Sequence, residues 1–240
     1  MKDLTLVCPY YCERDLLAFQ CGVWFSYADE IKQRLRIIVV DDASPRDPAG
    51  PLLERTRDRI GFDLQVLRIN EDIGWNCGGA KNLGVAEATT EWVVLLDIDH
   101  VLPEDSVRNM LDAPKLDRLG VYTFKRTVAG GQRRRPAPEV FLLRRDTYCD
   151  MGGYDEDHCS RSGCVNINDA IDAHTHGRIV LRNVWSIDVR FMLPDPNEAL
   201  RVRERRIGAA HATDVIARKA SGELPPRAHD QLRFTWARIL

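Results

Sequence analysis

Short apolar runs alternate with longer amphipathic stretches along the first 112 residues. Four runs of four to six residues, rich in Val, Ile and Leu, occur at 4–8, 37–40, 64–69 and 92–96. Runs this short, bounded by polar residues, predict buried parallel strands. Stretches with helical spacing separate them, at 13–32, 51–60 and from about 78 to 90. The alternation predicts an α/β fold with a mostly parallel sheet and right-handed crossovers.

The pattern is less regular after residue 112. It predicts strands at 119–125, 139–144 and 183–191, then a helix at 198–219 and a final helix carrying Leu232, Phe234 and Trp236. We therefore divide the chain into a domain at 1–192, with halves 1–112 and 113–192, and a helical C-terminal extension at 193–240. The extension is expected to pack on the core or to pair two subunits into a homodimer.

Two carboxylates follow the fourth apolar run. Ligands of open α/β sheets bind outside the carboxyl ends of the strands, where Asp97 and Asp99 would lie. Residues two apart on an extended chain point the same way. Two such carboxylates can hold Mg²⁺ or Mn²⁺. The alternative is a strand that ends in two solvated turn aspartates.

The second apolar run also ends in an acid pair, Asp41 and Asp42. A carboxylate there can accept a hydrogen bond from a nucleobase N–H or a ribose hydroxyl, and the alternative is an Asx-type turn. Before the fourth run, Gly78-Gly79 lets the backbone approach a ligand, the helix N-terminus favours anions, and Lys81 adds a cation.

Composition narrows the class of protein. The 240 residues carry a net charge of −2, so no strong overall field draws the chain to nucleic acid or membrane. It has no apolar run of the roughly 18–20 residues that a membrane span needs and no signal-peptide core. Seven cysteines, taken as reduced thiols, favour a cytoplasmic protein. The spacing of His158, Cys159 and Cys164 fits no common zinc pattern.

Four segments together resemble the family 2 nucleotide-sugar glycosyltransferases. They are Val7-Cys8-Pro9-Tyr10-Tyr11, Ile38 to Ser44, Asn70 to Gly84, and Leu95-Leu96-Asp97-Ile98-Asp99, in the order and spacing of that family. The resemblance implies the GT-A fold, in which helices flank a mostly parallel central sheet. It also implies a metal-dependent enzyme that takes a sugar from a nucleotide-diphospho-sugar.

The resemblance also implies residue roles. Asp97 and Asp99 correspond to the family's DxD motif and would hold Mn²⁺ or Mg²⁺, while Asp42 would read the base, often uracil. His100 replaces a common acid, and Lys81 replaces an arginine, so it would face phosphate as a point charge. The expected donor-binding residues are Pro9, Tyr10, Tyr11, Glu13, Asp41, Asp42, Asn70, Gly74, Gly78, Gly79, Lys81, Asn82, Asp97 and Ile98.

The acceptor side is expected in the second half. Met151 to Glu156 resembles the family's G-G-F-D-E segment, and Asp169 is the best match to its catalytic base, although Asn168 stands where the family has Glu. Asp172, one turn further along, is the second candidate, and a helix-cap role is the alternative for Asp169. A single base opposite the leaving group implies inversion. His211 could be a late metal ligand, as in some GT-A enzymes, or structural.

Several functions remain open. The leading interpretation is an inverting glycosyltransferase with a UDP-sugar donor. Its acceptor hydroxyl would belong to a glycan, a lipid-linked sugar, a protein or DNA with hydroxylated bases. A pyrophosphorylase is disfavoured because residues 8–12 lack the Gly-rich loop of that class. A catalytically silent sugar-nucleotide or glycan-binding module is the non-enzymatic alternative.

Overall fold

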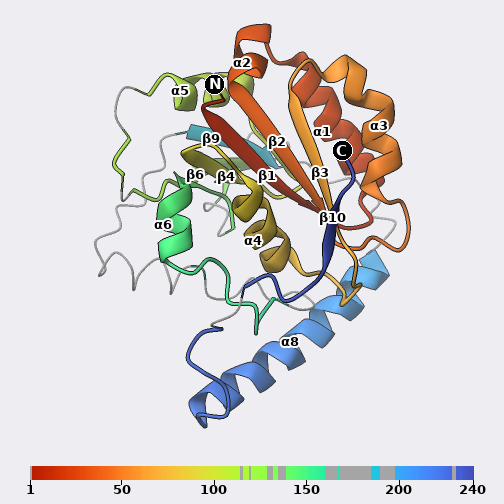
Figure 1. The fold of residues 1–240 in the computed structure, drawn as a ribbon, viewed down its shortest axis with the longest axis vertical. Helices are drawn as coiled ribbons and strands as arrows, with labels where there is room; N and C mark the ends of the chain where they lie inside the picture. Colours follow the sequence, from red (N-terminus) through yellow and green to blue (C-terminus); the bar gives the residue numbers. More distant parts are fainter. Residues whose placement is uncertain are drawn as a thin grey trace.

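The computed structural model has a central six-stranded sheet (Figure 1). It describes residues 2–113, 116–118, 120–128, 132–134, 139–159, 167, 185–189, 198–228 and 231–240, with the backbone alone at 57–60, 127–128, 132–134, 185–189 and 198–207. The strand order is β10-β3-β2-β1-β4-β8. The bounds are β1 Leu4–Tyr10, β2 Leu35–Asp41, β3 Asp63–Ile69, β4 Trp92–Leu95, β8 Phe141–Arg144 and β10 Trp236–Arg238.

Strands β1 to β4 are parallel, as the sequence predicted, and an antiparallel strand borders each side of them. Strand β8 pairs with β4, and β10 pairs with β3. The helices are α1 Arg14–Ser26, α2 Asp29–Arg34, α3 Ala49–Ile60, α4 Cys77–Glu87, α5 Glu104–Leu111, α6 Arg145–Asp150 and α8 Glu198–Ala220. None of the described helices is long and apolar enough to cross a membrane.

Buried side chains form two cores, one on each face of the sheet. Alternate residues of β1 separate them: Leu6 packs with the α1 residues Leu17 and Trp24, whereas Val7 packs with Leu83 of α4. This alternation follows from the two-residue period of a strand. The sheet is therefore covered by helices on both faces (Figure 1). Because β1 to β4 are parallel, the loops that follow them lie together at the carboxyl edge of the sheet.

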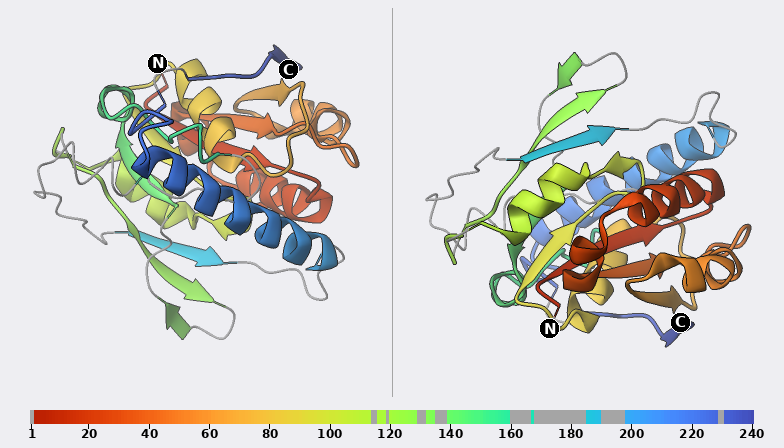
Figure 2. Two further views of the ribbon diagram at one scale, coloured as in Figure 1. Left: turned by 90° about the horizontal axis from the view of Figure 1, so that it is seen from below. Right: turned by 90° about the horizontal axis from the view of Figure 1, so that it is seen from above.

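A second sheet contains four strands in the order β5-β9-β6-β7. Their bounds are β5 His100–Val101, β6 Phe124–Val128, β7 Gln132–Arg134 and β9 Trp185–Val189. Figure 2 shows β6 and β9 along one side of the molecule. Strand β5 directly follows Asp99, so the candidate metal residues lie where the chain passes from one sheet to the other.

The end of the chain corrects a prediction. The final helix expected around Leu232, Phe234 and Trp236 is wrong, because Trp236–Arg238 forms β10 on the edge of the central sheet. The three side chains recur at every second residue and pack against the α4-side core. A spacing of two is the period of a strand, so the correct signal was present. The helix predicted at 198–219 is confirmed as α8.

Candidate functional site

A turn after β4 carries the two candidate metal-binding aspartates. Strand β4 ends at Leu95, and the amide of His100 donates to the carbonyl of Asp97 over 3.0 Å. The extended geometry predicted for Asp97 and Asp99 is therefore wrong, because the chain turns to enter β5. The turn still gathers potential ligands: one atom each of Asp97, Asp99 and His100 lie within 4.8 Å of one another.

His100 is the member of this group that the sequence did not identify as a ligand. Its Nδ1 lies 2.7 Å from Asp99 Oδ1 and 3.9 Å from Asp97 Oδ2, and the ring is buried. Gln20 of α1 holds the turn in place, because its Nε2 donates to the carbonyls of Ile98, at 3.0 Å, and His100, at 2.6 Å. Two carboxylates and an imidazole suit a divalent cation.

Lys81 is buried and binds one of the two candidate metal-binding aspartates. Its side chain is fully buried, and Nζ donates to Asp97 Oδ1 at 2.8 Å and to the carbonyl of Glu139 at 2.9 Å. The ammonium also lies 5.5 Å from the centre of the Tyr154 ring. A buried lysine needs such partners, since desolvating an unpaired charge is costly. In this structure it partly neutralises Asp97.

Glu139 joins the same cluster, although the sequence analysis predicted only that a strand begins there. Burial raises the pKa of its carboxyl group, an effect that the charge of Lys81 and the Tyr154 hydroxyl oppose. The hydroxyl of Tyr154 lies 2.9 Å from Glu139 Oε2. The signal that could have identified Glu139 is an acidic residue just before a buried strand.

The two acids at the end of β2 have different surroundings. Asp41 accepts hydrogen bonds from the amides of Ser44, at 2.8 Å, and Ala49, at 2.9 Å, and from Arg68 Nη1 at 2.7 Å. It therefore closes the loop before α3, as in the Asx-type turn that was the alternative interpretation of this acid pair. The fully buried Asp42 accepts from the amide of Asn76 and thereby links the end of β2 to the start of α4.

Aromatic residues surround this edge of the sheet. Pro9 and Tyr10 are buried in β1, and the Tyr10 hydroxyl donates to the carbonyl of Asp47. The Tyr11 hydroxyl lies 3.2 Å from Asp72 Oδ1, and its ring is 5.9 Å from that of Trp75. Tyr11 and Trp75 thus form an aromatic pair beside the loop after β3. Glu13 immediately precedes α1 without capping it through its side chain.

The glycines before and within α4 serve packing and turns. Asn76 caps the helix by accepting from the Gly79 amide at 3.1 Å. A Cβ atom added to Gly78 would lie 2.3 Å from Cys159 Sγ, so that position admits no larger residue without rearrangement. Gly74 has φ 79°, a conformation that favours glycine.

Asn82 holds the second half of the chain against α4. Its Oδ1 accepts from the Tyr148 hydroxyl at 2.6 Å and the Tyr154 amide at 2.9 Å, while Nδ2 lies 2.9 Å from Glu156 Oε1 and 2.6 Å from Gln231 Oε1. Such a saturated buried amide fixes one geometry of the surrounding chain. Asn82 therefore joins α4 to the loop that follows α6 and to Gln231.

The remaining predicted site residues lie elsewhere. Asn70 is exposed, and its Nδ2 donates to Thr235 Oγ1 at 2.9 Å. His211 Nε2 lies 3.0 Å from the carbonyl of Asp157, and the metal-competent group among the described residues does not include it. Asp169 and Asp172 lie outside the described residues, so their predicted roles are untested.

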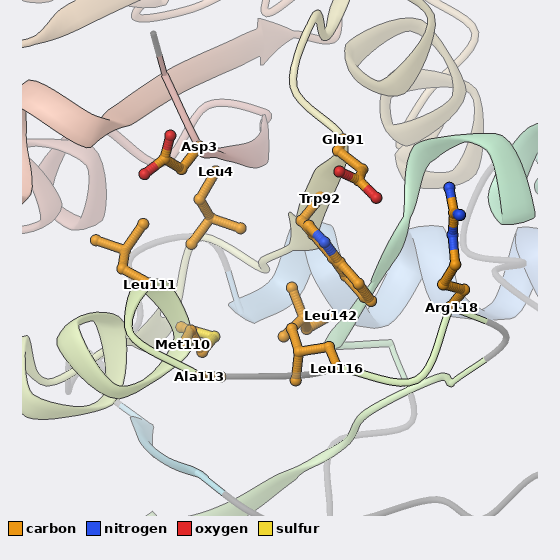
Figure 3. Close-up of a pocket in the computed structure, with 10 residues that line it drawn as sticks. All are labelled: Asp3, Leu4, Glu91, Trp92, Met110, Leu111, Ala113, Leu116, Arg118 and Leu142. Atoms are coloured by element: carbon orange, nitrogen blue, oxygen red, sulfur yellow. The ribbon is translucent and has the colours of Figure 1, made fainter.

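A cavity of about 510 Å³ lies at the opposite end of the sheet (Figure 3). Leu4 and Trp92, the first residues of β1 and β4, line it together with Met110, Leu116 and Leu142. Asp97 and Asp99 follow the far end of β4. Asp3, Glu91 and Arg118 add charged groups to the lining, and none of the predicted site residues belongs to it, so we place the candidate site at the carboxyl edge.

Comparison with known proteins matches this architecture. The family model described as glycosyl transferase family 2 matches residues 23–174. TarS 1–349 of S. aureus in complex with UDP aligns with TM-score 0.59 and 15% identity, covering 88% of this chain and 65% of that one. The mannosyltransferase PcManGT of Pyrobaculum calidifontis, in complex with GDP-Man and Mn²⁺, aligns with TM-score 0.60 and 17% identity, covering 93% and 66%.

The chain thus spans just under two thirds of the length of these two structures. No curated protein matches its sequence significantly. At identities this low, the structural likeness establishes the GT-A fold alone.

Proposed function

Because the chain belongs to glycosyl transferase family 2, we propose that it is an inverting, metal-dependent enzyme transferring a sugar from a UDP-sugar to an acceptor hydroxyl. The observation that carries the proposal is the Asp97, Asp99 and His100 group at the carboxyl edge of a parallel sheet. That edge is where open α/β sheets bind their ligands. The acceptor would be a glycan, a lipid-linked sugar, a protein or modified DNA.

The donor diphosphate would bind beside this group. Asp97 and Asp99 would hold Mn²⁺ or Mg²⁺, with His100 as a third ligand or as the residue that orients Asp99 through its 2.7 Å contact. When bound, the metal stabilises the negative charge of the leaving diphosphate. The Mn²⁺ and GDP-Man named for PcManGT are consistent with a site of this kind.

The nucleoside would lie toward Asp42 and the Tyr11–Trp75 pair. Support comes from their position at the ends of β1, β2 and β3, on the same edge as Asp97. An aromatic pair offers a face for a base, and a carboxylate can accept from the N3–H of uracil. Cytosine lacks that donor, which makes UDP preferable to CDP.

Deprotonation of the acceptor hydroxyl is assigned to Asp169, with Asp172 as the second candidate. Asp169→Asn preserves the shape and removes the basicity, so transfer should fall by about 10²–10⁴-fold while donor binding survives. Asp172→Asn is the matched control and should have the smaller effect. If only Asp172→Asn abolishes transfer, Asp172 is the base; if both variants retain it, this assignment is wrong.

A donor screen tests the function as a whole. Thermal unfolding is measured with UDP-, GDP-, CDP- and dTDP-sugars, each with and without Mn²⁺. A true donor at ~100 times its dissociation constant should stabilise the fold by about 2.7 kcal/mol, and by less without metal. Release of UDP with an acceptor mixture distinguishes a transferase from a silent binding module. A protein stabilised by none of these donors would contradict the proposal.

A further inference from the structure

A network of buried charges joins the loop 152–159 to the end of α8. The ammonium of Lys219 donates to Asp155 Oδ2 at 3.0 Å, to Asp157 Oδ2 at 2.8 Å and to the carbonyl of Pro225 at 2.9 Å. The three charged side chains are between 2% and 11% exposed. A single cation thus satisfies two nearly buried carboxylates and turns the chain after α8 back toward the core.

The chain that follows α8 makes further bonds to the same loop. Glu156 accepts from the amides of Leu232, at 2.7 Å, and Arg233, at 2.9 Å. Arg227 Nη2 donates to the carbonyl of Gly153 at 2.7 Å, and the guanidinium of Arg233 binds Asp157. Every acid of the loop is therefore engaged by the C-terminal segment.

The same segment also holds the loop after β3. Thr235 Oγ1 accepts from Asn70 Nδ2 and donates to Glu71 Oε1 at 2.8 Å, while its carbonyl accepts from the Asn70 amide at 3.0 Å. Strand β10 begins at the next residue and pairs with β3. Residues 219–228 and 231–238 thus bind both the loop 152–159 and the loop after β3; we refer to these residues as the C-terminal clasp.

We propose that the C-terminal clasp is a positioning element of the active site, a role that rests on the proposed transferase function. The clasp ends 64 positions after the last residue that the family model matches, at 174, so this role is not contained in the family assignment. Through Asp155 and Asp157 it fixes the loop that leads into the stretch containing Asp169. Through Asn70 it fixes the loop expected to contact the donor.

The loop in turn reaches the metal site. Tyr154 lies between Gly153 and Asp155 in this loop. Its hydroxyl binds Glu139, and its ring lies 5.5 Å from the ammonium of Lys81. Lys81 binds Asp97. A displaced loop would therefore disturb the acceptor side first and the acid group second, whereas the ends of β1 and β2 would remain in place.

Lys219→Met tests the acceptor end of the clasp, with Arg218→Met as its matched control. Arg218 is the preceding helix residue, 41% exposed, and pairs with Asp214 and Glu223 away from the loop. We expect Lys219→Met to lower kcat by about 10–100-fold with little change in donor KM, because misplacing a reacting group by about 1 Å has effects of this size. Arg218→Met should match the parent, and Lys219→Arg should recover part of kcat.

Thr235→Val tests the donor end. It removes the side-chain bonds to Asn70 and Glu71 while the backbone bond remains. Losing these two exposed side-chain hydrogen bonds, each of small net value, should raise donor KM about fivefold and leave kcat nearly unchanged. Opposite kinetic signatures at the two ends would not arise from a general loss of stability.

Amide hydrogen exchange supplies a readout that needs no activity. Amides of residues 152–159 should exchange faster in Lys219→Met than in Arg218→Met. If Lys219→Met does not fold, Arg233→Gln, at a side chain 40% exposed, replaces it with the same expectations. Unchanged kcat and unchanged exchange would overturn the clasp. If the parent transfers no sugar but residues 152–159 still exchange faster in Lys219→Met, the proposed transferase function is wrong, whereas the contact between the clasp and the loop is supported.

Discussion

The letters Asp-x-Asp-His occur twice in this chain, at 97–100 and 155–158, and their surroundings differ. In the first segment a turn gathers two carboxylates and an imidazole within 4.8 Å, with Lys81 against one carboxylate. In the second, Lys219 and Arg233 satisfy the carboxylates, and the described residues there form no such group. The same residue types thus form a candidate metal-binding group in one place and a structural joint in the other.

The two segments differ in the cations and the burial around their carboxylates: Lys219 and Arg233 bind the second segment, whereas Lys81 binds Asp97 in the first. A carboxylate that is already paired and hydrogen-bonded gains little from a metal, whereas carboxylates turned toward one another repel until a cation joins them. The side chains of Asp97 and Asp99 are 23% and 25% exposed, against 2% and 7% for Asp155 and Asp157. The first segment is therefore open to a ligand from solvent, and the second is closed.

The largest difference should appear in catalysis. Asp99→Asn removes a charged ligand of the first segment, so turnover should fall by at least about 10²-fold, since metal stabilisation of a leaving group is worth several kcal/mol. The additional stabilisation by nucleotide in the presence of Mn²⁺ should disappear. Asp157→Asn is the comparison variant and should retain the metal response. Equal metal responses in Asp99→Asn and the parent would contradict the assignment.

Substitutions in the second segment should lower the free energy of unfolding. Burial alone would raise the pKa of Asp157, but Lys219 and Arg233 together outweigh it and hold the pKa below its usual value. Its stabilising contribution is therefore present above the unfolded pKa near 4 and is lost as pH falls through the folded value. Asp157→Asn should cost about 2 kcal/mol at pH 7, less than the 3–5 kcal/mol of a fully broken buried pair, because Lys219 keeps Asp155.

Urea unfolding of the parent and Asp157→Asn at pH 7 and pH 3 measures this cost. The difference between the two proteins should shrink at the lower pH. A difference that is independent of pH would indicate lost packing instead of a lost charge pair.

Lys81 tests whether the internal cation of the first segment competes with a metal ion. If the ammonium competes with a metal for Asp97, Lys81→Met should strengthen binding of Mn²⁺ alone by about tenfold or more. Two unit charges 4 Å apart interact by about 4 kcal/mol at an effective dielectric constant near 20, so relief of part of this repulsion suffices. Calorimetric titration with Mn²⁺ in the absence of nucleotide measures it. Unchanged or weaker binding would show that Lys81 supports the site instead of competing for it.

The smallest effect concerns His158, the histidine of the second segment. Burial lowers the pKa of His158, outweighing the pull of Asp155 and Asp157, while Lys219 and His211 act in the same direction as burial. The unfolded chain then binds a proton that the folded chain does not, so stability falls as pH drops below the unfolded value near 6.5. His158→Phe should flatten the dependence of the unfolding free energy on pH between 7 and 5. An identical slope in parent and variant would exclude His158 as the cause.

Local patterns predicted the sheet and the first acid segment well. The runs 4–8, 37–40, 64–69 and 92–96 became β1 to β4 because each is short, mainly apolar and bounded by polar residues. Asp97 and Asp99 were found because they follow such a run. Their turn was not predicted, since it depends on the strand β5 that follows and on Gln20 of α1.

Long-range pairings were beyond local patterns. Lys219 lies more than 60 residues from Asp155 and Asp157, and Gln231 lies 149 residues from Asn82. No spacing rule connects such partners, so the bonds of Asn82 to the second half of the chain and the link between the loop acids and the chain end could not be predicted. The donor contact predicted for Asn82 stays a prediction. The final helix failed for a related reason: the alternation of Leu232, Phe234 and Trp236 becomes decisive only once β3 offers an edge.

Strand β10 also has a consequence for solubility. Without it, β3 would border the sheet with a row of unpaired backbone groups, and its apolar side chains would present a template for another chain. The C-terminal residues cover that row in antiparallel register, from Trp236 opposite Ile69 to Arg238 opposite Leu67. Arg238 adds a charge at the rim through its 2.8 Å pair with Glu87. A chain shortened before Trp236 should therefore self-associate through β3, with light scattering rising as its concentration increases.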